Sequence, residues 1–356
     1  MKILVDIGHP AHVHYFRNFI RIMQNKGHDF FISARNKEVS QILLEKYDIP
    51  YFDRGRGSNK LSGKVVYVFK ADWSILKKAR FFKPDLFLSF ASPYAAHVST
   101  LTGKPHISFT DTENARLGIL SFAPFTDCIL TPDAFLGNFG SKHVRFKGFM
   151  ELCYLHPKYF KPNRNVLPEI DVGENEPYAL LRFVSWVANH DFGQSGIPDD
   201  TKTELVKELT KSIRVLISSE GEMPAELIKY KIKVSPEKMH DVLANAAIYI
   251  GEGATMASEC TMLGTPAIYA NSLTAGTIEE QAKYGLLFSY RNSDSVFGKA
   301  EELLNNPNLK QEFVQRRDKM LKDKIDVTEF MVWFVENYPE SVKILKDNPG
   351  YQYNFM

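Results

Sequence analysis

The sequence predicts an α/β protein built from two doubly wound domains, each with a parallel sheet covered by helices. Short apolar runs alternate with amphipathic helical stretches in the first half of the chain, and the same alternation restarts after residues 158–177. Alternation of this kind is typical of parallel sheets that are covered on both faces. The length of 356 residues also favours two domains, because one domain commonly spans roughly 100–200 residues.

Each predicted element follows from the period of its apolar residues. In the first half we expect strands at Ile3–Asp6, Asp29–Ser33, Leu86–Phe90, His106–Thr110 and Cys128–Thr131, with helices at Tyr15–Lys26 and Glu38–Lys46. In the second half we expect strands at Tyr178–Val184, Arg214–Ser218, Ala247–Gly251 and Ala267–Tyr269. Prolines and a glycine in Lys158–Pro177 predict a linker, and Val327–Lys346 has a helical pattern. The expected domains are therefore 1–160 and 177–326, with a C-terminal helix in 327–356 that packs back on the first domain.

Composition excludes several classes of partner. The 44 basic and 42 acidic side chains nearly cancel, so the chain lacks the basic character expected of a nucleic-acid-binding protein. Its three cysteines, Cys128, Cys153 and Cys260, form no CxxC pair and predict neither a zinc site nor a disulfide framework. Without a signal peptide or a long apolar span, we expect a cytoplasmic protein, with peripheral contact to the inner face of the membrane left open.

The second half contains the most informative motif. A predicted strand ends in Gly251-Glu252-Gly253, and a helix begins at about Ala254. Glycine lets a backbone approach a phosphate closely, and the N–H groups at a helix N-terminus attract the anion, so Gly251, Gly253, Ala254 and Thr255 are candidate phosphate contacts. Glu259 lies in the second turn, where a carboxylate could accept both hydroxyls of a ribose. The helix is expected to end at Gly264. The alternative for this motif is a plain tight turn between a strand and a helix, without a ligand. Outside the motif, Gln281 is a further candidate substrate-binding residue.

A second candidate site follows the first strand. Gly8, His9, Pro10, Ala11, His12, Val13 and His14 lie where a parallel sheet places its ligand, beyond the carboxyl end of a strand. His12 is the leading base or substrate-binding residue, because an imidazole changes charge near neutral pH. Gly8, His9 and His14 are further candidate contacts, with structural roles for His9 and His14 as the alternative. His12 and His14 would not share a face of a helix that begins near Val13, and no Asp-x-Asp motif occurs, so we expect no metal.

The glycine turn, Glu259 and the Leu263-Gly264-Thr265-Pro266 ending resemble the donor-nucleotide motif of GT-B glycosyltransferases and of the non-hydrolysing UDP-N-acetylglucosamine 2-epimerase. The chain resembles the family called domain of unknown function 354. The motifs that carry this resemblance are the opening from Ile7 to His14 and the segment Leu181–Asp191, and the resemblance covers nearly the whole chain. The resemblance implies a GT-B-like pair of Rossmann-like domains and a nucleotide sugar as co-substrate, with no obligate cofactor.

Further candidate residues lie in both halves, those of the first half from the resemblance and those of the second from their place at the end of a strand. Thr112-Glu113-Asn114 resembles the Glu-Gln-Asn element of the N-acetylglucosaminyltransferase of peptidoglycan synthesis, so Asp111 and Glu113 are the expected catalytic carboxylates and Asn114 a substrate contact. Arg182 ends the first strand of the second domain, where a guanidinium can bind a diphosphate with two hydrogen bonds, although an ion pair is the alternative. Ser185 and His190 follow in the same turn, as ligand contacts or as packing residues.

We therefore expect a metal-independent glycosyltransferase that moves a sugar, from a UDP donor, to a glycan or lipid-linked acceptor in cell-surface polysaccharide synthesis. A sugar-nucleotide epimerase is the first alternative, but the Gly-Thr-Arg-Pro-Glu opening of that enzyme is replaced here by Gly8-His9-Pro10-Ala11-His12. A non-catalytic nucleotide-sugar-binding protein is the second alternative.

Two other segments bear on partners. Lys64–Lys83 mixes basic and aromatic residues at helical spacing, as helices at membrane surfaces do; a helix packed on the sheet with a basic outer face is the alternative. Arg54-Gly55-Arg56-Gly57-Ser58 has the composition of a mobile loop or lid.

Overall fold

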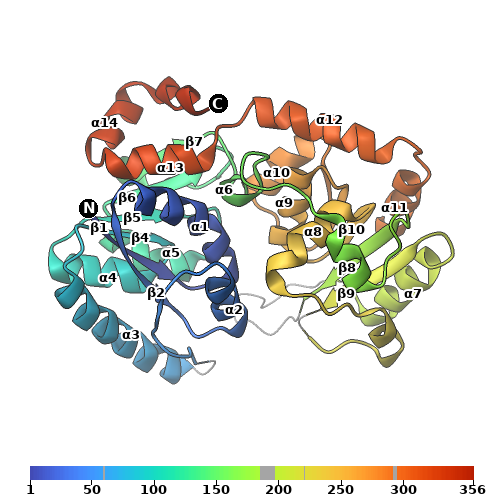
Figure 1. The fold of residues 1–356 in the computed structure, drawn as a ribbon, viewed down its shortest axis with the longest axis horizontal. Coiled ribbons are helices and arrows are strands. Elements are labelled where there is room, and N and C mark those ends of the chain that lie inside the picture. The colour runs from blue at the N-terminus through green and yellow to red at the C-terminus, as the bar shows by residue number, and fades with distance from the viewer. Residues whose placement is uncertain (59–60, 185–196, 220, 292–294) are drawn as a thin grey trace. The chain divides into compact units, whose positions relative to one another are not determined.

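The structure is a computed structural model that describes residues 1–58, 61–184, 197–219, 221–291 and 295–356 (Figure 1). The chain divides into two compact units. Unit 1 comprises Met1–Tyr154 and Lys324–Met356, and unit 2 comprises Leu155–Asp323. Each unit contains one parallel β-sheet with its helices.

Unit 1 is built on a seven-stranded sheet in the order β3-β2-β1-β4-β5-β6-β7, with every neighbouring pair parallel. The strands are β1 (Lys2–Ile7), β2 (Asp29–Ala34), β3 (Phe52–Asp53), β4 (Leu86–Phe90), β5 (His106–Phe109), β6 (Cys128–Pro132) and β7 (His143–Phe146). Ile3, Leu4 and Val5 of β1 are fully buried, because a central strand of a covered parallel sheet turns both faces to the core.

The helices of unit 1 are α1 (Pro10–Asn25), α2 (Glu38–Lys46), α3 (Leu61–Phe82), α4 (Pro93–Thr102), α5 (Arg116–Phe122), α6 (Leu152–Leu155, which reaches the unit boundary), α13 (Val327–Glu336) and α14 (Glu340–Asp347). Helix α1 begins at Pro10, three residues before the start near Val13 that we expected from the sequence. The reason is local: the His9 side chain accepts a hydrogen bond from the Ala11 N–H, and proline is well suited to the first helical position.

Helix α13 belongs to unit 1. Its residues Phe330, Met331 and Phe334 are fully buried, and the Thr328 hydroxyl donates to the Cys153 carbonyl at 2.9 Å. Lys26 and His28 also reach Glu336 near the end of α13, at 2.6 and 3.1 Å. The last part of the chain is therefore part of the core of unit 1.

Unit 2 has a five-stranded parallel sheet in the order β12-β11-β10-β8-β9. Its strands are β8 (Tyr178–Phe183), β9 (Arg214–Ser219), β10 (Ile248–Gly251), β11 (Ala267–Ala270) and β12 (Leu287–Tyr290). Its helices are α7 (Asp199–Leu209), α8 (Met239–Asn245), α9 (Ala254–Leu263), α10 (Gly276–Lys283), α11 (Val296–Leu304) and α12 (Leu309–Lys322). The two parallel sheets confirm the predicted α/β fold class.

The linker prediction for Lys158–Pro177 is wrong for its middle part. A 3₁₀ helix (Arg164–Ile170) forms there, and its apolar side chains Val166, Leu167 and Ile170 are buried in unit 2. The prolines and the single glycine predicted an open connection, but the burial of these three apolar side chains packs the middle of the segment into unit 2.

Candidate functional site

The carboxyl end of the unit 1 sheet brings several of the predicted residues together. His12 lies in the first turn of α1, and its Nδ1 accepts a hydrogen bond from the Gly8 N–H at 3.3 Å. The ring lies 4.9 Å from that of Phe90 at the end of β4, measured between ring centroids. A neutral imidazole that accepts at Nδ1 carries its proton at Nε2. His12 is therefore set up as a hydrogen-bond donor through Nε2.

Burial, helped by nearby positive charge, keeps His9 and His12 neutral. Desolvation lowers the pKa of His9 to about 4, and the charges of Lys37 and Arg35 act in the same direction. Desolvation also lowers the pKa of His12 well below its usual value, with His9 and Arg54 adding to the effect. These rings are therefore uncharged at neutral pH.

His14 occupies a different environment. Its side chain is buried between two tyrosine rings, 5.1 Å from that of Tyr154 and 5.8 Å from that of Tyr47. It packs within unit 1, in the structural role that the sequence analysis left open for it.

A buried ion pair under the first turn was missed by the sequence analysis. Arg54 donates to both carboxylate oxygens of Asp6, at 2.9 and 3.2 Å, and both side chains are almost fully buried. The Ser33 and Ser92 hydroxyls also donate to this carboxylate. Arg54 lies in the stretch that we expected to be a mobile loop or lid. The structure corrects this for Arg54, because the guanidinium is held by Asp6 and by the Tyr67 hydroxyl at 2.6 Å.

The carboxylates predicted for catalysis follow β5. Desolvation raises the pKa of Asp111 to about 6, a hydrogen bond from the Thr112 hydroxyl at 3.0 Å lowers it, and the nearby Glu113 charge raises it. Glu113 accepts a hydrogen bond from the Leu136 N–H at 3.1 Å, and Asn114 lies in the turn before α5. A carboxylate with a pKa near 6 can take up a proton at neutral pH, which is what a general base requires.

In unit 2, the glycine motif forms the turn between β10 and α9. Gly253 is the N-cap residue of α9, which begins at Ala254, and no side chain caps the helix. The N–H groups in the first turn of a helix have no partner within the helix, so those of Ala254 and Thr255 are available at this end. Helix α9 ends at Gly264, whose φ of 69° is left-handed, as the sequence indicated.

Gly251 is required by close packing. A Cβ atom at this position would lie 2.5 Å from the Tyr249 hydroxyl and 2.8 Å from Cβ of Arg182. At Gly253 the nearest atoms to such a Cβ lie at 3.7 Å, which is an ordinary contact. The two glycines therefore differ: packing among the described residues requires glycine at Gly251 and leaves room for a larger residue at Gly253.

Three other predicted residues lie near this turn. Arg182, near the end of β8, donates to the Ser218 hydroxyl at 2.8 Å. Glu259 is buried in α9, and its carboxylate bonds to Nε2 of His240 at 3.0 Å. Gln281 is fully buried and donates to the Ser258 hydroxyl at 2.6 Å, which gives it a packing role against α9. Ser185 and His190 lie outside the described residues.

Glu252 was not among the site residues predicted from the sequence. Its buried carboxylate accepts hydrogen bonds from the Val184 N–H at 2.9 Å and the Ile197 N–H at 2.6 Å. The Asn271 amide donates to its carbonyl at 2.9 Å. Glu252 thus connects the segments that follow β8, β10 and β11 by hydrogen bonds, and these bonds hold the glycine turn in place.

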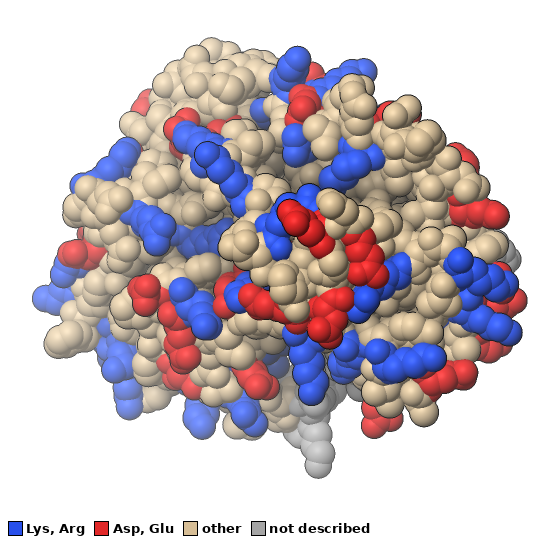
Figure 2. Space-filling view, turned by 45° about the vertical axis from the view of Figure 1, so that its right-hand side comes forward, with Lys and Arg blue, Asp and Glu red and all other residues tan. Residues whose placement is uncertain are grey.

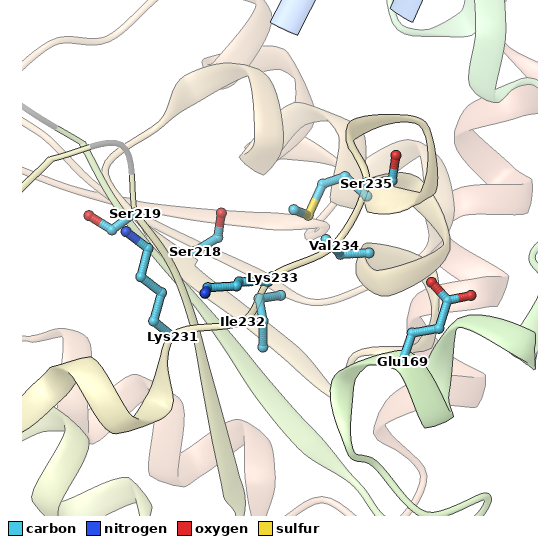
Figure 3. A pocket seen from close by; sticks show the side chains of 9 residues that line it. Glu169, Ser218, Ser219, Lys231, Ile232, Lys233, Val234 and Ser235 are labelled. Carbon is cyan, nitrogen blue, oxygen red and sulfur yellow. The ribbon is translucent and has the colours of Figure 1, made fainter. Parts of the chain in front are cut away.

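A pocket of about 730 Å³ opens at the end of β9 (Figure 3). Its polar lining comes from Ser218, Ser219, Lys231, Lys233 and Ser235, together with Glu169 of the 3₁₀ helix. Figure 3 shows the ammonium groups of Lys231 and Lys233 on the side of the two strand serines, with Glu169 across the pocket. Because Ser218 accepts the hydrogen bond from Arg182, this pocket adjoins the residues around the glycine turn.

Within the described residues, no three His, Cys, Asp or Glu side chains gather as they would around a metal ion. Among the helices that the structure describes, none is long and apolar enough to cross a membrane.

The two parallel sheets with their covering helices define a GT-B-like fold, and comparisons with known proteins agree. The model of the family described as protein of unknown function (DUF354) matches residues 1–338, and this chain belongs to that family. The family expected from its motifs is thereby confirmed. An uncharacterised protein of Methanocaldococcus jannaschii is 22% identical over 284 residues, which cover 75% of this chain and 81% of that protein.

Solved structures share the fold at low identity. The S. aureus MnaA structure with UDP has a TM-score of 0.71 at 11% identity and covers 96% of this chain and 98% of its own. The UDP-GlcNAc 2-epimerase of M. jannaschii, in complex with UDP-GlcNAc and UDP, has a TM-score of 0.65 at 15% identity, with coverages of 89% and 99%. The glycosyltransferase SsfS6 of Streptomyces sp. SF2575, complexed with thymidine diphosphate, has a TM-score of 0.61 at 14% identity, with coverages of 94% and 99%. At these identities the likeness establishes the fold.

Proposed function

We propose that this protein is a metal-independent glycosyltransferase that moves a sugar from a UDP donor to a glycan or lipid-linked acceptor in the synthesis of a cell-surface polysaccharide. The observation that carries the proposal is the turn at Gly253. It has an uncapped helix N-terminus, a glycine that packing against the described residues does not require, and Arg182 beside it. This is the arrangement that a diphosphate needs.

In this proposal the donor binds to unit 2. The first-turn N–H groups of α9 and the guanidinium of Arg182 hold the diphosphate, and Glu259 binds the ribose. The pocket at the end of β9 adjoins Arg182 through Ser218, so it takes the base. UDP is favoured as the donor nucleotide because two of the structures that share this fold contain it.

The acceptor side of the reaction is assigned to unit 1. Asp111, with its pKa of about 6, takes the proton of the acceptor hydroxyl as the acceptor oxygen bonds to the sugar carbon. The bond from that carbon to the diphosphate oxygen breaks, and the positive charges around α9 stabilise the departing nucleotide. His12 donates a hydrogen bond to the sugar through Nε2.

An epimerase is the second candidate, because several structures with this fold are UDP-GlcNAc 2-epimerases, and because Asp111 and Glu113 supply a pair of carboxylates. Such an enzyme converts its substrate without an acceptor. A transferase releases the nucleotide only when an acceptor is present.

The test begins with thermal denaturation of the purified protein in the presence of UDP-, GDP-, CMP- and dTDP-sugars, because a ligand that binds the folded state raises its stability. We expect a shift with UDP-sugars that Glu259→Ala abolishes. NMR of the bound nucleotide sugar, with and without a lipid extract as acceptor, then separates the two reactions. A new sugar epimer without acceptor would favour the epimerase, and the absence of any thermal shift would contradict both.

A further inference from the structure

Helix α3 of unit 1 has a buried face and an exposed face of unusual composition. Tyr67, Ala71, Ile75 and Ala79 follow one another at intervals of four and are buried. Ile75 and Ala79 belong to the core cluster that includes Leu4 and Phe87 of the sheet. This face already anchors the helix, so the other face does not contribute to the core.

Large apolar side chains also line the exposed face. Val66 is 66% exposed, Phe69 72%, Trp73 56% and Phe81 90%. Their spacing of three, four and eight residues places them along one side of the helix. Single exposed apolar residues are common on protein surfaces, whereas a row that includes three aromatic rings on one helix indicates a surface that another phase or molecule covers.

Cations accompany these side chains. Lys70, Lys77 and Arg80 are exposed on the same side of α3, and Lys77 Nζ lies 5.3 Å from the centre of the Trp73 ring. Within the part of the chain that the structure describes, none of these three cations forms an ion pair. Figure 2 shows a face of the molecule on which basic and acidic side chains are interspersed.

Acidic residues are nearly absent from the same stretch. Asp72 is the sole acid between Val66 and Lys83. Its side chain is only 16% exposed, and it bonds to Nδ1 of His97 at 2.9 Å. Between Val66 and Lys83, the exposed face of α3 is therefore apolar and positively charged, and the one acidic side chain of this stretch is paired with His97.

We propose that this exposed face, made of Val66, Phe69, Lys70, Trp73, Lys77, Arg80 and Phe81, docks on an anionic lipid bilayer. The aromatic rings enter the interface between headgroups and acyl chains, and the cations stay with the negatively charged headgroups. A bilayer fits both features at once, because its surface is apolar a few ångströms below a layer of negative charge.

Hydrogen bonds connect α3 to the residues at the carboxyl end of the unit 1 sheet. On its buried face, Tyr67 accepts a hydrogen bond from Arg54 and donates one to the Gly55 carbonyl. The docking helix is thus directly bonded to the residues beneath the His12 turn. The docking inference itself does not depend on the proposed transferase activity.

The test is co-sedimentation of the full chain with vesicles of phosphatidylcholine alone and with vesicles rich in phosphatidylglycerol. We expect binding to the anionic vesicles that weakens with added salt. Lys70→Gln, Lys77→Gln and Arg80→Gln should each weaken it about fivefold. The combined variant Phe69→Ser, Trp73→Ser and Phe81→Ser should lower binding by at least about tenfold.

Matched controls come from unit 2. Ile228 and Phe297 are also exposed, at 58% and 38%, and Ile228→Ser with Phe297→Ser should leave vesicle binding unchanged. Lys283→Gln serves as the charge control. Circular dichroism and thermal melting check that each variant is folded.

Several results would overturn the proposal. These are equal binding by the wild type and the α3 variants, or no binding of the wild type to anionic vesicles. A dimer that is seen by light scattering and lost in the apolar variant, without any vesicle binding, would identify a second copy of the chain as the occupant instead.

Discussion

Gly251 and Gly253 are two residues apart, yet their replacement by alanine should have opposite consequences. Among the described residues, a methyl group at Gly253 meets no atom closer than 3.7 Å, and the backbone there, with φ of −90° and ψ of 115°, accepts any residue except proline without strain. Gly253→Ala should therefore keep the stability of the wild type to within about 0.5 kcal/mol. A methyl group at Gly251 would lie 2.5 Å from the Tyr249 hydroxyl. Gly251→Ala should therefore destabilise the protein by about 1–3 kcal/mol.

For ligand binding, the informative variant is Gly253→Ala, because it should lose affinity for a diphosphate while it keeps its stability. If a diphosphate approaches the N-terminus of α9, the Gly253→Ala methyl occupies its path, at a cost of about 1–3 kcal/mol, or roughly five- to 150-fold in Kd. Calorimetric titration with UDP measures this loss, and thermal denaturation of the same samples measures stability. A folded Gly253→Ala protein that binds UDP as tightly as the wild type would refute the reasoning. The motif would then be a plain turn between strand and helix.

Three further predictions concern single side chains. Glu259→Ala removes the proposed ribose contact and should cost about 1.5–3 kcal/mol in UDP binding by calorimetry; an unchanged Kd would contradict the assignment. With Asp111 as the base and its pKa of about 6, turnover should fall about tenfold per pH unit below that pKa and level off above it. Asp111→Asn should abolish this limb, and an identical profile in the variant would exclude the role. Burial lowers the pKa of His106 to about 3, whereas an unfolded imidazole protonates near pH 6.5, so the unfolded state binds more protons between these values. Between pH 7 and pH 5 the wild type should lose about 2 kcal/mol more stability than His106→Gln in urea denaturation; parallel pH dependences would show that His106 is not responsible.

The central strands could be predicted from the sequence because a strand that is buried on both faces requires a continuous run of apolar residues. The short outer strands could not. β3 has two residues, Phe52–Asp53, and β7 and β12 are only partly buried, so neither length nor composition separates them from loops. The start of α1 was misjudged for another reason, since His9 caps the helix with a side chain that is not a common N-cap residue.

The residues around the candidate sites show the same division. The glycine turn at Gly253 and its helix could be predicted because strand, turn and helix follow one another in the chain. Arg54 could not, because its burial depends on Asp6, which lies far away in the sequence, and a basic residue at the start of a glycine-rich stretch has the local pattern of a loop. Glu252 was passed over for a similar reason: its partners Val184 and Ile197 come from a distant segment.

Unit 1 is made from two separate stretches of chain, whereas unit 2 is continuous from Leu155 to Asp323. During synthesis, unit 2 has all of its residues before unit 1 does. The core of unit 1 lacks Phe330, Met331 and Phe334 until α13 leaves the ribosome, so Cys153 has no Thr328 to receive a hydrogen bond from until then. The part of the protein that carries His12 and Asp111 is therefore the last to be completed, although its first strand is the first segment to be made.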